Sequence, residues 1–392
     1  MFQFFLSDKA RIVKENGKEW QHPFPVTRDY KAPSSPDPIL YGDYFSAIRQ
    51  FLEKDNYDNL VSSVSLASGK NVSPEEIEGF SVFLVKHGEY YHPSKVEVSF
   101  SEEKQPFVLN VAVTDSGLNC MEKEYESLMR LNREKPNSYI PDVYTKGSVF
   151  RKNKKISMVL GEWFEDYHEF HLSVSKNNEK AIIVWDPVLG NYVLPKKHEK
   201  ELYRQATKIL TFFYNPVTFS KINSWHHAAG DFVIKRNGRD IDVKLITVRN
   251  HESPFTEEDR NAHEDIGIKL DALFVFFINM SIRMRLDRKD GTGEFLWSDD
   301  SAAEGMVRGF FEGVETWGNI GENPFSWMDG FTYYLSRQKE EALRHIAHDI
   351  VSSYHPAAPD TPVAKQYVGE HIRVLYKEIK NLTATQDESN TI

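Results

Sequence analysis

Two neighbouring segments near the middle of the chain carry side chains that could do chemistry together. Residues 224–231 read Ser-Trp-His-His-Ala-Ala-Gly-Asp, and a strand-like segment, 232–235, follows directly. An imidazole with an ordinary pKa of about 6.5 suits a general base, which makes His226 a candidate catalytic base. A carboxylate binds divalent cations through its oxygen atoms, which makes Asp231 a candidate catalytic and metal-binding residue. The pattern predicts a loop that presents a base and an acid immediately before a strand.

Further metal-ligand types follow this loop. Asp242 offers a carboxylate and Thr247 a weak hydroxyl ligand. His227 and His251 add imidazoles, so a transition-metal centre, and with it a metal-dependent hydrolase, is one alternative. Adjacent His residues on a strand point to opposite faces, and no H-x-x-x-H or H-x-E pattern in this segment supports a shared metal. A hydrogen-bonded or solvated His is the competing interpretation.

Hydrophobic periodicity predicts the elements that must position these side chains. Three antiparallel strands are expected, then a helix, then two strands, at residues 80–85, 95–100, 106–113, 118–133, 139–149 and 156–160. The second half predicts a hairpin, a helix, the loop and a strand pair, at 181–194, 197–214, 223–230 and 232–246. From about residue 258 onward the pattern predicts helices, including a buried one over the apolar run 273–278.

The first 79 residues show separate signals. A hairpin is expected over residues 2–20, with its turn at Asn16-Gly17. A proline-rich linker follows at 31–38, and an apolar stripe predicts a helix that begins at Asp43. Ser73-Pro74-Glu75-Glu76 has the form of a capping box and predicts a further helix.

This order of elements resembles the protein-kinase-like fold, and within it the small-molecule branch that includes aminoglycoside phosphotransferases and choline kinases. The resemblance implies an α+β fold with two lobes, an antiparallel five-stranded N-lobe (80–163) and a mostly helical C-lobe (164–382). Residues 1–79 would then form an N-terminal extension, and residues 383–392 a disordered tail. ATP and Mg²⁺ are the ligands that such a fold implies.

The N-lobe departs from the motifs of this family. Asn110 stands where the family has the Lys that neutralises the nucleotide phosphates, and a neutral amide cannot replace that charge. Glu124, or Glu122, matches the Glu that would hold this Lys, with a solvated helix face as the competing interpretation. No G-x-G-x-x-G loop lies between the first two strands. Glu162 and Trp163 match the hinge that binds adenine, with a packed strand end as the alternative.

The C-lobe departs from the family as well. Its loop resembles H-G-D-x-H-x-x-N, with His226 in place of the catalytic Asp and Asp231 in place of the metal-binding Asn. The end of the second strand resembles V-K-L-I-D-F-G, with Thr247 in place of the Asp that binds magnesium. Without the Lys and this Asp, phosphoryl transfer loses its two largest electrostatic contributions. The sequence therefore predicts a catalytically degenerate kinase-like protein, a pseudokinase with a binding or regulatory role.

The main alternative keeps catalysis. In it, the chain is an active ATP-dependent small-molecule phosphotransferase with a non-standard residue set. Asp231, Asp242 and His226 would then carry the metal and base roles, with Thr247 as a weak further ligand.

The composition narrows the choice of partners and compartment. The chain has 48 Lys and Arg against 58 Asp and Glu, a net charge of −10, which argues against a nucleic-acid or anionic-membrane surface. Its 40% hydrophobic residues can bury a core, which predicts a soluble globular protein. A single cysteine, Cys120, excludes an internal disulfide, and the N-terminus has no signal-peptide pattern, so a cytoplasmic location is expected.

One basic stretch stands out against this acidic background. Residues 283–294 carry four basic side chains and two glycines. Their oxygen ligands do not follow the EF-hand order, so a charged turn is expected. The functional alternative is a local site for an anionic ligand or an acidic partner.

Overall fold

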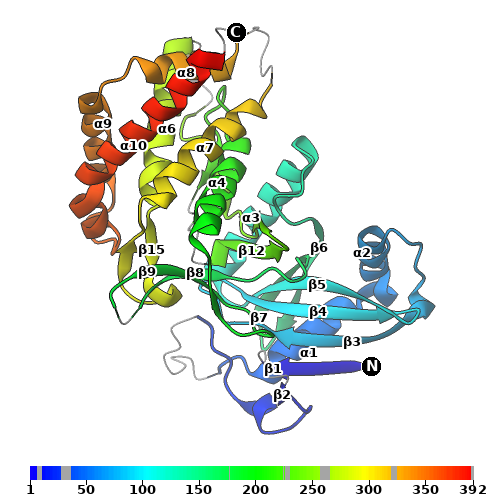
Figure 1. Ribbon diagram of the computed structural model, residues 1–392. Helices are drawn as coiled ribbons and strands as arrows, with labels where there is room; N and C mark the ends of the chain where they lie inside the picture. The colour runs from blue at the N-terminus through cyan, green and yellow to red at the C-terminus, as the bar shows by residue number, and fades with distance from the viewer. Residues whose placement is uncertain are drawn as a thin grey trace. The chain divides into compact units, whose positions relative to one another are not determined.

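The computed structural model describes residues 1–6, 11–27, 37–175, 177–223, 225, 230–256, 265–318 and 325–389, with side chains as far as residue 383. These residues form a mixed α+β structure (Figure 1). The chain divides into two compact units, Met1–Glu165 (unit 1) and Asp166–Ile392 (unit 2). Unit 1 holds a large mixed sheet, and unit 2 holds most of the described helices.

The sheet of unit 1 has seven strands in the order β2-β1-β3-β4-β5-β7-β6. The prediction of a five-stranded sheet is therefore wrong. The N-terminal segment adds two strands along one edge, because β1 pairs in parallel with β3, with Phe2 opposite Phe80. A parallel register between distant segments has no local signal in the sequence. The strands are β1 Phe2–Leu6, β2 Arg11–Ile12, β3 Ile77–Leu84, β4 His92–Phe100, β5 Glu103–Ala112, β6 Val143–Arg151 and β7 Lys154–Glu162.

Two local predictions near the N-terminus need correction. β1 and β2 do form a hairpin, but Leu6 lies opposite Arg11, so the connection is residues 7–10 and not Asn16-Gly17. Residues 7–10 lie outside the described residues. Ser73 and Glu76 do form the capping box, but the helix Pro74–Glu76 is a single 3-10 turn, because β3 begins at Ile77.

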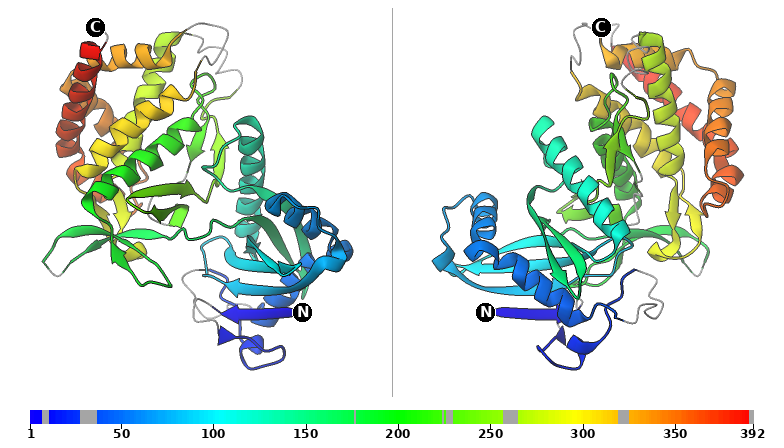
Figure 2. Two further views of the ribbon diagram at one scale, coloured as in Figure 1. Left: turned by 45° about the vertical axis from the view of Figure 1, so that its right-hand side comes forward. Right: turned by 180° about the vertical axis from the view of Figure 1, so that it is seen from behind.

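Helices cover both faces of the sheet. Side chains alternate along each strand, so both faces carry apolar residues against which a helix can pack. In β5, Phe107, Leu109 and Val111 face the core that α1 (Tyr41–Leu52) and α2 (Asp58–Ser68) help to form. On the opposite face of β5, Ala112 packs with Met121 of α3 (Asp115–Glu134). Figure 2 shows the sheet with these helices from two further sides. Asn110 therefore lies on the face that α3 covers, whereas Glu162 lies opposite Phe107 and so on the other face.

Unit 2 combines short strand pairs with a group of helices. Its strands are β8 Phe170–Val174, β9 Lys180–Val184, β10 Tyr192–Val193, β11 Lys221–Asn223, β12 Phe232–Asn237, β13 Asp240–Leu245, β14 Asn250–Glu252, β15 Leu286–Arg288 and β16 Phe295–Trp297. Its helices are α4 Lys196–Phe212, α6 Ile266–Arg283, α7 Ser301–Glu315, α8 Trp327–Ser336, α9 Glu340–Ser353 and α10 Thr361–Ser389.

A row of glycines lets α4 and α7 approach closely. A Cβ atom at Gly305 would lie 2.2 Å from the carbonyl oxygen of Lys200, and one at Gly309 would lie 1.9 Å from that of Arg204. Real Cβ atoms do not approach backbone so closely, so only glycine fits. The closely packed α4 and α7 thus form one layer, and β13 packs against α4.

The C-terminal part differs from the expected run of helices. The apolar run 273–278 does lie in a helix, α6, and is largely buried. The strands β15 and β16 interrupt the helices, because the charged turn expected at 283–294 closes a hairpin. The helix α10 continues to Ser389, into the segment expected to be a tail. Among the described residues, no helix combines the length and apolarity needed to cross a membrane.

Candidate functional site

Two strand pairs of unit 2 position the loop that the sequence singled out. β12 and β13 form a hairpin, and β11 pairs with β14 so that Asn223 lies opposite Asn250. The loop 224–231 runs from β11 to β12, and the segment 246–249 runs from β13 to β14. The Ile246 N–H donates to the Asp231 carbonyl over 2.7 Å, which joins the two segments. The fold thus brings Asp231 and the candidate metal-binding strand end together.

Asp231 is buried and held by an arginine of the neighbouring segment. Its side chain is 1% exposed, and its carboxylate oxygens accept hydrogen bonds from Nη1 and Nη2 of Arg249 over 2.7 and 2.6 Å. This is the bidentate geometry in which Arg and carboxylate interact most strongly. A divalent cation at Asp231 would have to displace a fixed positive charge from a buried carboxylate.

The other two proposed metal ligands, Thr247 and Asp242, lie at different levels of the β12–β13 hairpin. Thr247 is buried just beyond β13. Asp242 lies opposite Lys235 in the hairpin, interacts with Lys244 over 3.2 Å and accepts a hydrogen bond from the Tyr167 hydroxyl. Four residues of extended strand separate the levels of Asp231 and Asp242, a distance of about 13 Å along the hairpin. One metal ion could not contact both carboxylates.

Of the three candidate histidines, His251 is the one that the structure describes. His226 and His227 lie outside the described residues. His251 is buried, and its Nε2 lies 2.8 Å from the Phe213 carbonyl oxygen, which matches the hydrogen-bonded interpretation. In the part of the chain that the structure describes, no three His, Cys, Asp or Glu side chains gather as a metal site would require.

In unit 1, Asn110 and Glu124 occupy the same side of the sheet. Asn110 lies in β5 between Val108 and Ala112, on the face that α3 covers. Glu124 of α3 is 4% exposed, so it does not belong to a solvated helix face. Glu122 does, since it is more than half exposed and forms an ion pair with Lys146.

A lysine on the strand next to Asn110 was missed at the sequence level. Lys95 of β4 lies opposite Val108 of β5, and strand alternation places it on the face that carries Asn110. Its ammonium lies 3.0 Å from Glu97 and 3.4 Å from Glu165. The alternation of β4 could have revealed this lysine, but its two carboxylate partners required the structure.

The predicted hinge residues make contacts within unit 1. The Glu162 carboxylate accepts a hydrogen bond from the Asp142 N–H over 3.2 Å. The Glu162 N–H in turn donates to the Asp142 carbonyl over 2.8 Å. The ring of Trp163 lies 5.5 Å from the Lys95 ammonium. Glu162 is thus bonded to the backbone of Asp142, and Trp163 lies beside Lys95.

Comparison of the sequence with models of known protein families and with curated proteins finds no match. A functional assignment therefore depends on the chemistry of the two units themselves.

Proposed function

We propose that this chain is a catalytically degenerate kinase-like protein, a pseudokinase, with a binding or regulatory role. The observation that carries the proposal is the bidentate ion pair between Asp231 and Arg249. Asp231 occupies the position at which the resemblance expects a metal ligand, and Arg249 already supplies the positive charge there. Phosphoryl transfer needs a divalent cation bound beside the nucleotide phosphates, so an internal guanidinium at this carboxylate opposes it.

The state of the charges in unit 1 supports the same proposal. Asn110 provides no cation where the resemblance expects one. Lys95, the lysine on the same face of the adjacent strand, interacts with the carboxylates of Glu97 and Glu165. A lysine between two carboxylates neutralises phosphates less well than one with its charge available. In each unit, the charge that would serve phosphoryl transfer is matched by a partner from the same unit.

A thermal-shift titration with ATP tests this proposal. The melting temperature is measured without nucleotide, with ATP and EDTA, and with ATP plus Mg²⁺ or Mn²⁺, against the metal alone as the control. We expect no metal-dependent ATP shift, because a ligand raises the melting temperature only when it binds the folded state. A metal-dependent shift in the wild-type protein would contradict the proposal.

The variant Asp231→Asn identifies which alternative such a result would favour. Loss of the metal-dependent ATP shift in Asp231→Asn would favour the active phosphotransferase, because the carboxylate would then hold the metal. A shift with Mn²⁺ or Zn²⁺ alone, and none with ATP, would favour the metal-dependent hydrolase.

A further inference from the structure

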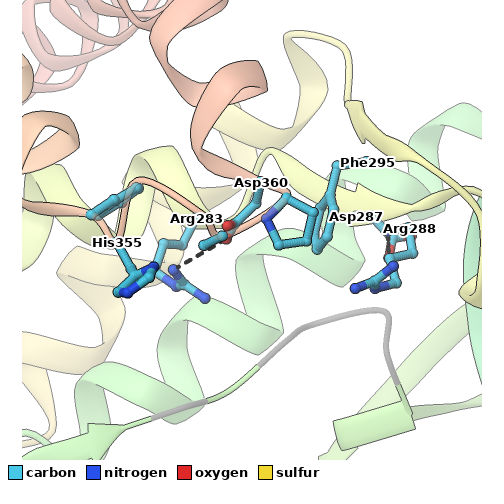
Figure 3. A pocket seen from close by; sticks show the side chains of 9 residues that line it. Arg283, Asp287, Arg288, Phe295, His355 and Asp360 are labelled. Atoms are coloured by element: carbon cyan, nitrogen blue, oxygen red, sulfur yellow. Dashed lines mark hydrogen bonds and ion pairs between the residues drawn. The ribbon is translucent and has the colours of Figure 1, made fainter.

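A pocket in unit 2 is formed by three elements that are distant in the sequence. Its volume is about 390 Å³, within the range of roughly 300–1,000 Å³ typical of small-molecule sites. The walls are the end of α6, the hairpin β15–β16 and the connection between α9 and α10 (Figure 3). The lining residues are Arg283, Asp287, Arg288, Phe295, Tyr354, His355, Ala358, Pro359 and Asp360. None of them belongs to the β12–β13 hairpin site.

The cationic groups of the pocket lie at two separate ends. In Figure 3, Arg283 lies beside His355, while Arg288 lies beyond the ring of Phe295. His355 Nδ1 accepts a hydrogen bond from the Ala357 N–H over 3.2 Å, which leaves Nε2 as the donor of a neutral ring. Arg283 and His355 thus form one donor group, and Arg288 forms the other.

Both guanidinium groups keep hydrogen-bond capacity. Arg288 stacks over Phe295 at 4.6 Å, and one of its N–H groups reaches the Gly293 carbonyl at 3.4 Å. None of the ion pairs between described residues includes Arg288. The nearest approach of Arg283 to the Asp360 carboxylate is 3.7 Å, from Nη1, and its guanidinium also interacts with the Tyr354 side chain. A guanidinium has five N–H donors, so both residues can still bind an acid group bidentately.

The two carboxylates of the pocket do not cancel this capacity. Asp287 is 3% exposed and accepts hydrogen bonds from the N–H groups of Leu172 and Arg288, over 2.6 and 2.7 Å. Its oxygens are therefore directed to the backbone. Burial also raises the pKa of Asp287 to about 7, so the group is partly protonated at neutral pH. Asp360 balances part of the charge of Arg283 and leaves that of Arg288.

The middle of the pocket is apolar and rigid. Phe295 lies between the two donor groups (Figure 3), and Pro359 also lines the pocket. Proline fixes φ, and the connection between α9 and α10 contains two, Pro356 and Pro359. A flat apolar group fits such a surface better than a hydrated ion does.

We propose that this pocket binds a small organic acid with an acidic group at each end of a flat apolar body. Arg283 and His355 bind one acidic group, Arg288 binds the other, and Phe295 contacts the body between them. The proposal goes beyond the pseudokinase assignment and does not depend on it, because it uses different residues.

Isothermal titration calorimetry on the full chain tests the proposal. The probes are benzene-1,4-dicarboxylate and 4-carboxyphenyl phosphate, which have two acidic groups, and benzoate and inorganic phosphate, which are controls without the second end. We expect both two-ended probes to bind, and each control to bind at least about tenfold more weakly. The stronger of the two-ended probes shows whether carboxylate or phosphate is preferred at one end.

Variants then connect binding to the named residues. We expect Arg288→Gln to weaken the two-ended probes to about the level of benzoate, because one donor group is lost. Arg337→Gln is the matched control, since Arg337 also lies over an aromatic ring, Tyr333, at 5.5 Å, but outside the pocket. Arg337→Gln should bind the two-ended probes with the same affinity as the wild type. Unchanged circular dichroism shows that Arg288→Gln has folded, and Arg288→Lys, which keeps the charge, should bind with intermediate affinity.

Three results would overturn the proposal. The first is that neither two-ended probe binds the wild-type chain. The second is that benzoate or inorganic phosphate binds as tightly as the two-ended probes. The third is that Arg288→Gln binds the two-ended probes with wild-type affinity.

Discussion

The β12–β13 hairpin site and the basic pocket use the same residue types in opposite ways. At the hairpin, Arg249 donates both terminal nitrogens to Asp231, at 2.7 and 2.6 Å. In the pocket, the nearest nitrogen of Arg283 lies 3.7 Å from the Asp360 carboxylate. The first geometry satisfies the carboxylate within the protein, and the second leaves donors for a ligand. Residue type therefore does not tell whether an arginine serves the fold or a ligand. The distance to its carboxylate partner within the protein does.

The largest effect should come from breaking the hairpin ion pair. We expect Arg249→Gln to lower the free energy of unfolding by about 3–5 kcal/mol, because the buried Asp231 carboxylate would lose its bidentate guanidinium. Urea denaturation measures this change. Arg283→Gln is the control for the loose pair and should cost about 1 kcal/mol or less. The double variant Asp231→Asn/Arg249→Gln also removes the buried negative charge and should recover part of the loss. Equal costs for Arg249→Gln and Arg283→Gln would remove the distinction between the two sites.

A pH series should reveal the buried carboxyl of the pocket. Burial raises the pKa of Asp287 from 3.8 to about 7, so the native state binds this proton more tightly than the unfolded state does. The contribution of Asp287 to stability is then complete below pH 3.8 and is lost as the pH rises through 7, by about 3 kcal/mol between pH 4 and 7. The difference in unfolding free energy between wild type and Asp287→Asn, from urea denaturation, should fall by this amount. A difference that stays constant with pH would show that Asp287 titrates normally.

Unit 1 should respond to pH in the opposite direction. His87 and His92 approach each other through their Nδ1 atoms at 3.2 Å, and burial together with the neighbouring imidazole lowers the pKa of His92 from 6.5 to about 3. The unfolded state therefore takes up the proton first, so stability present above pH 6.5 is lost as the pH falls, by about 2 kcal/mol between pH 7 and 5. Urea denaturation of wild type and His92→Gln at both pH values measures this contribution. A contribution that grows as the pH falls would contradict the assignment.

The smallest effect on stability should follow loss of Arg288. We expect Arg288→Gln to lower the free energy of unfolding by no more than about 1 kcal/mol, since the side chain is half-buried and its main contact is the Phe295 ring. The same variant should lose ligand affinity, which sharpens the contrast with Arg249. A loss of stability as large as that of Arg249→Gln would make Arg288 structural.

Local periodicity predicted much of the fold. The alternation at 80–85, 95–100 and 106–113 was confirmed as β3, β4 and β5, and the apolar stripes at 118–133 and 197–214 as α3 and α4. These signals lie within one element, so neighbouring residues suffice to define them. The seven-stranded sheet was not predictable, because β1 joins β3 across more than seventy residues without a local signal.

The position of the candidate site was predictable from the sequence, but the ion pair that Asp231 forms there was not. Its sequence places Asp231 immediately before β12, and the structure agrees. The partner Arg249 lies 18 residues later and reaches Asp231 only because the hairpin closes between them. In the same way, the basic stretch 283–294 was visible, but the opposite wall of the pocket, residues 354–360, comes from another part of the chain.

The sequence by itself determined the residue types, the strand and helix periods, the neutral amide at Asn110 and the acidic balance. The tertiary structure alone decided which charges are cancelled and which remain for a ligand. The physical reason is that a charge depends on its distance to a partner and on its burial, and both are set when distant segments pack together.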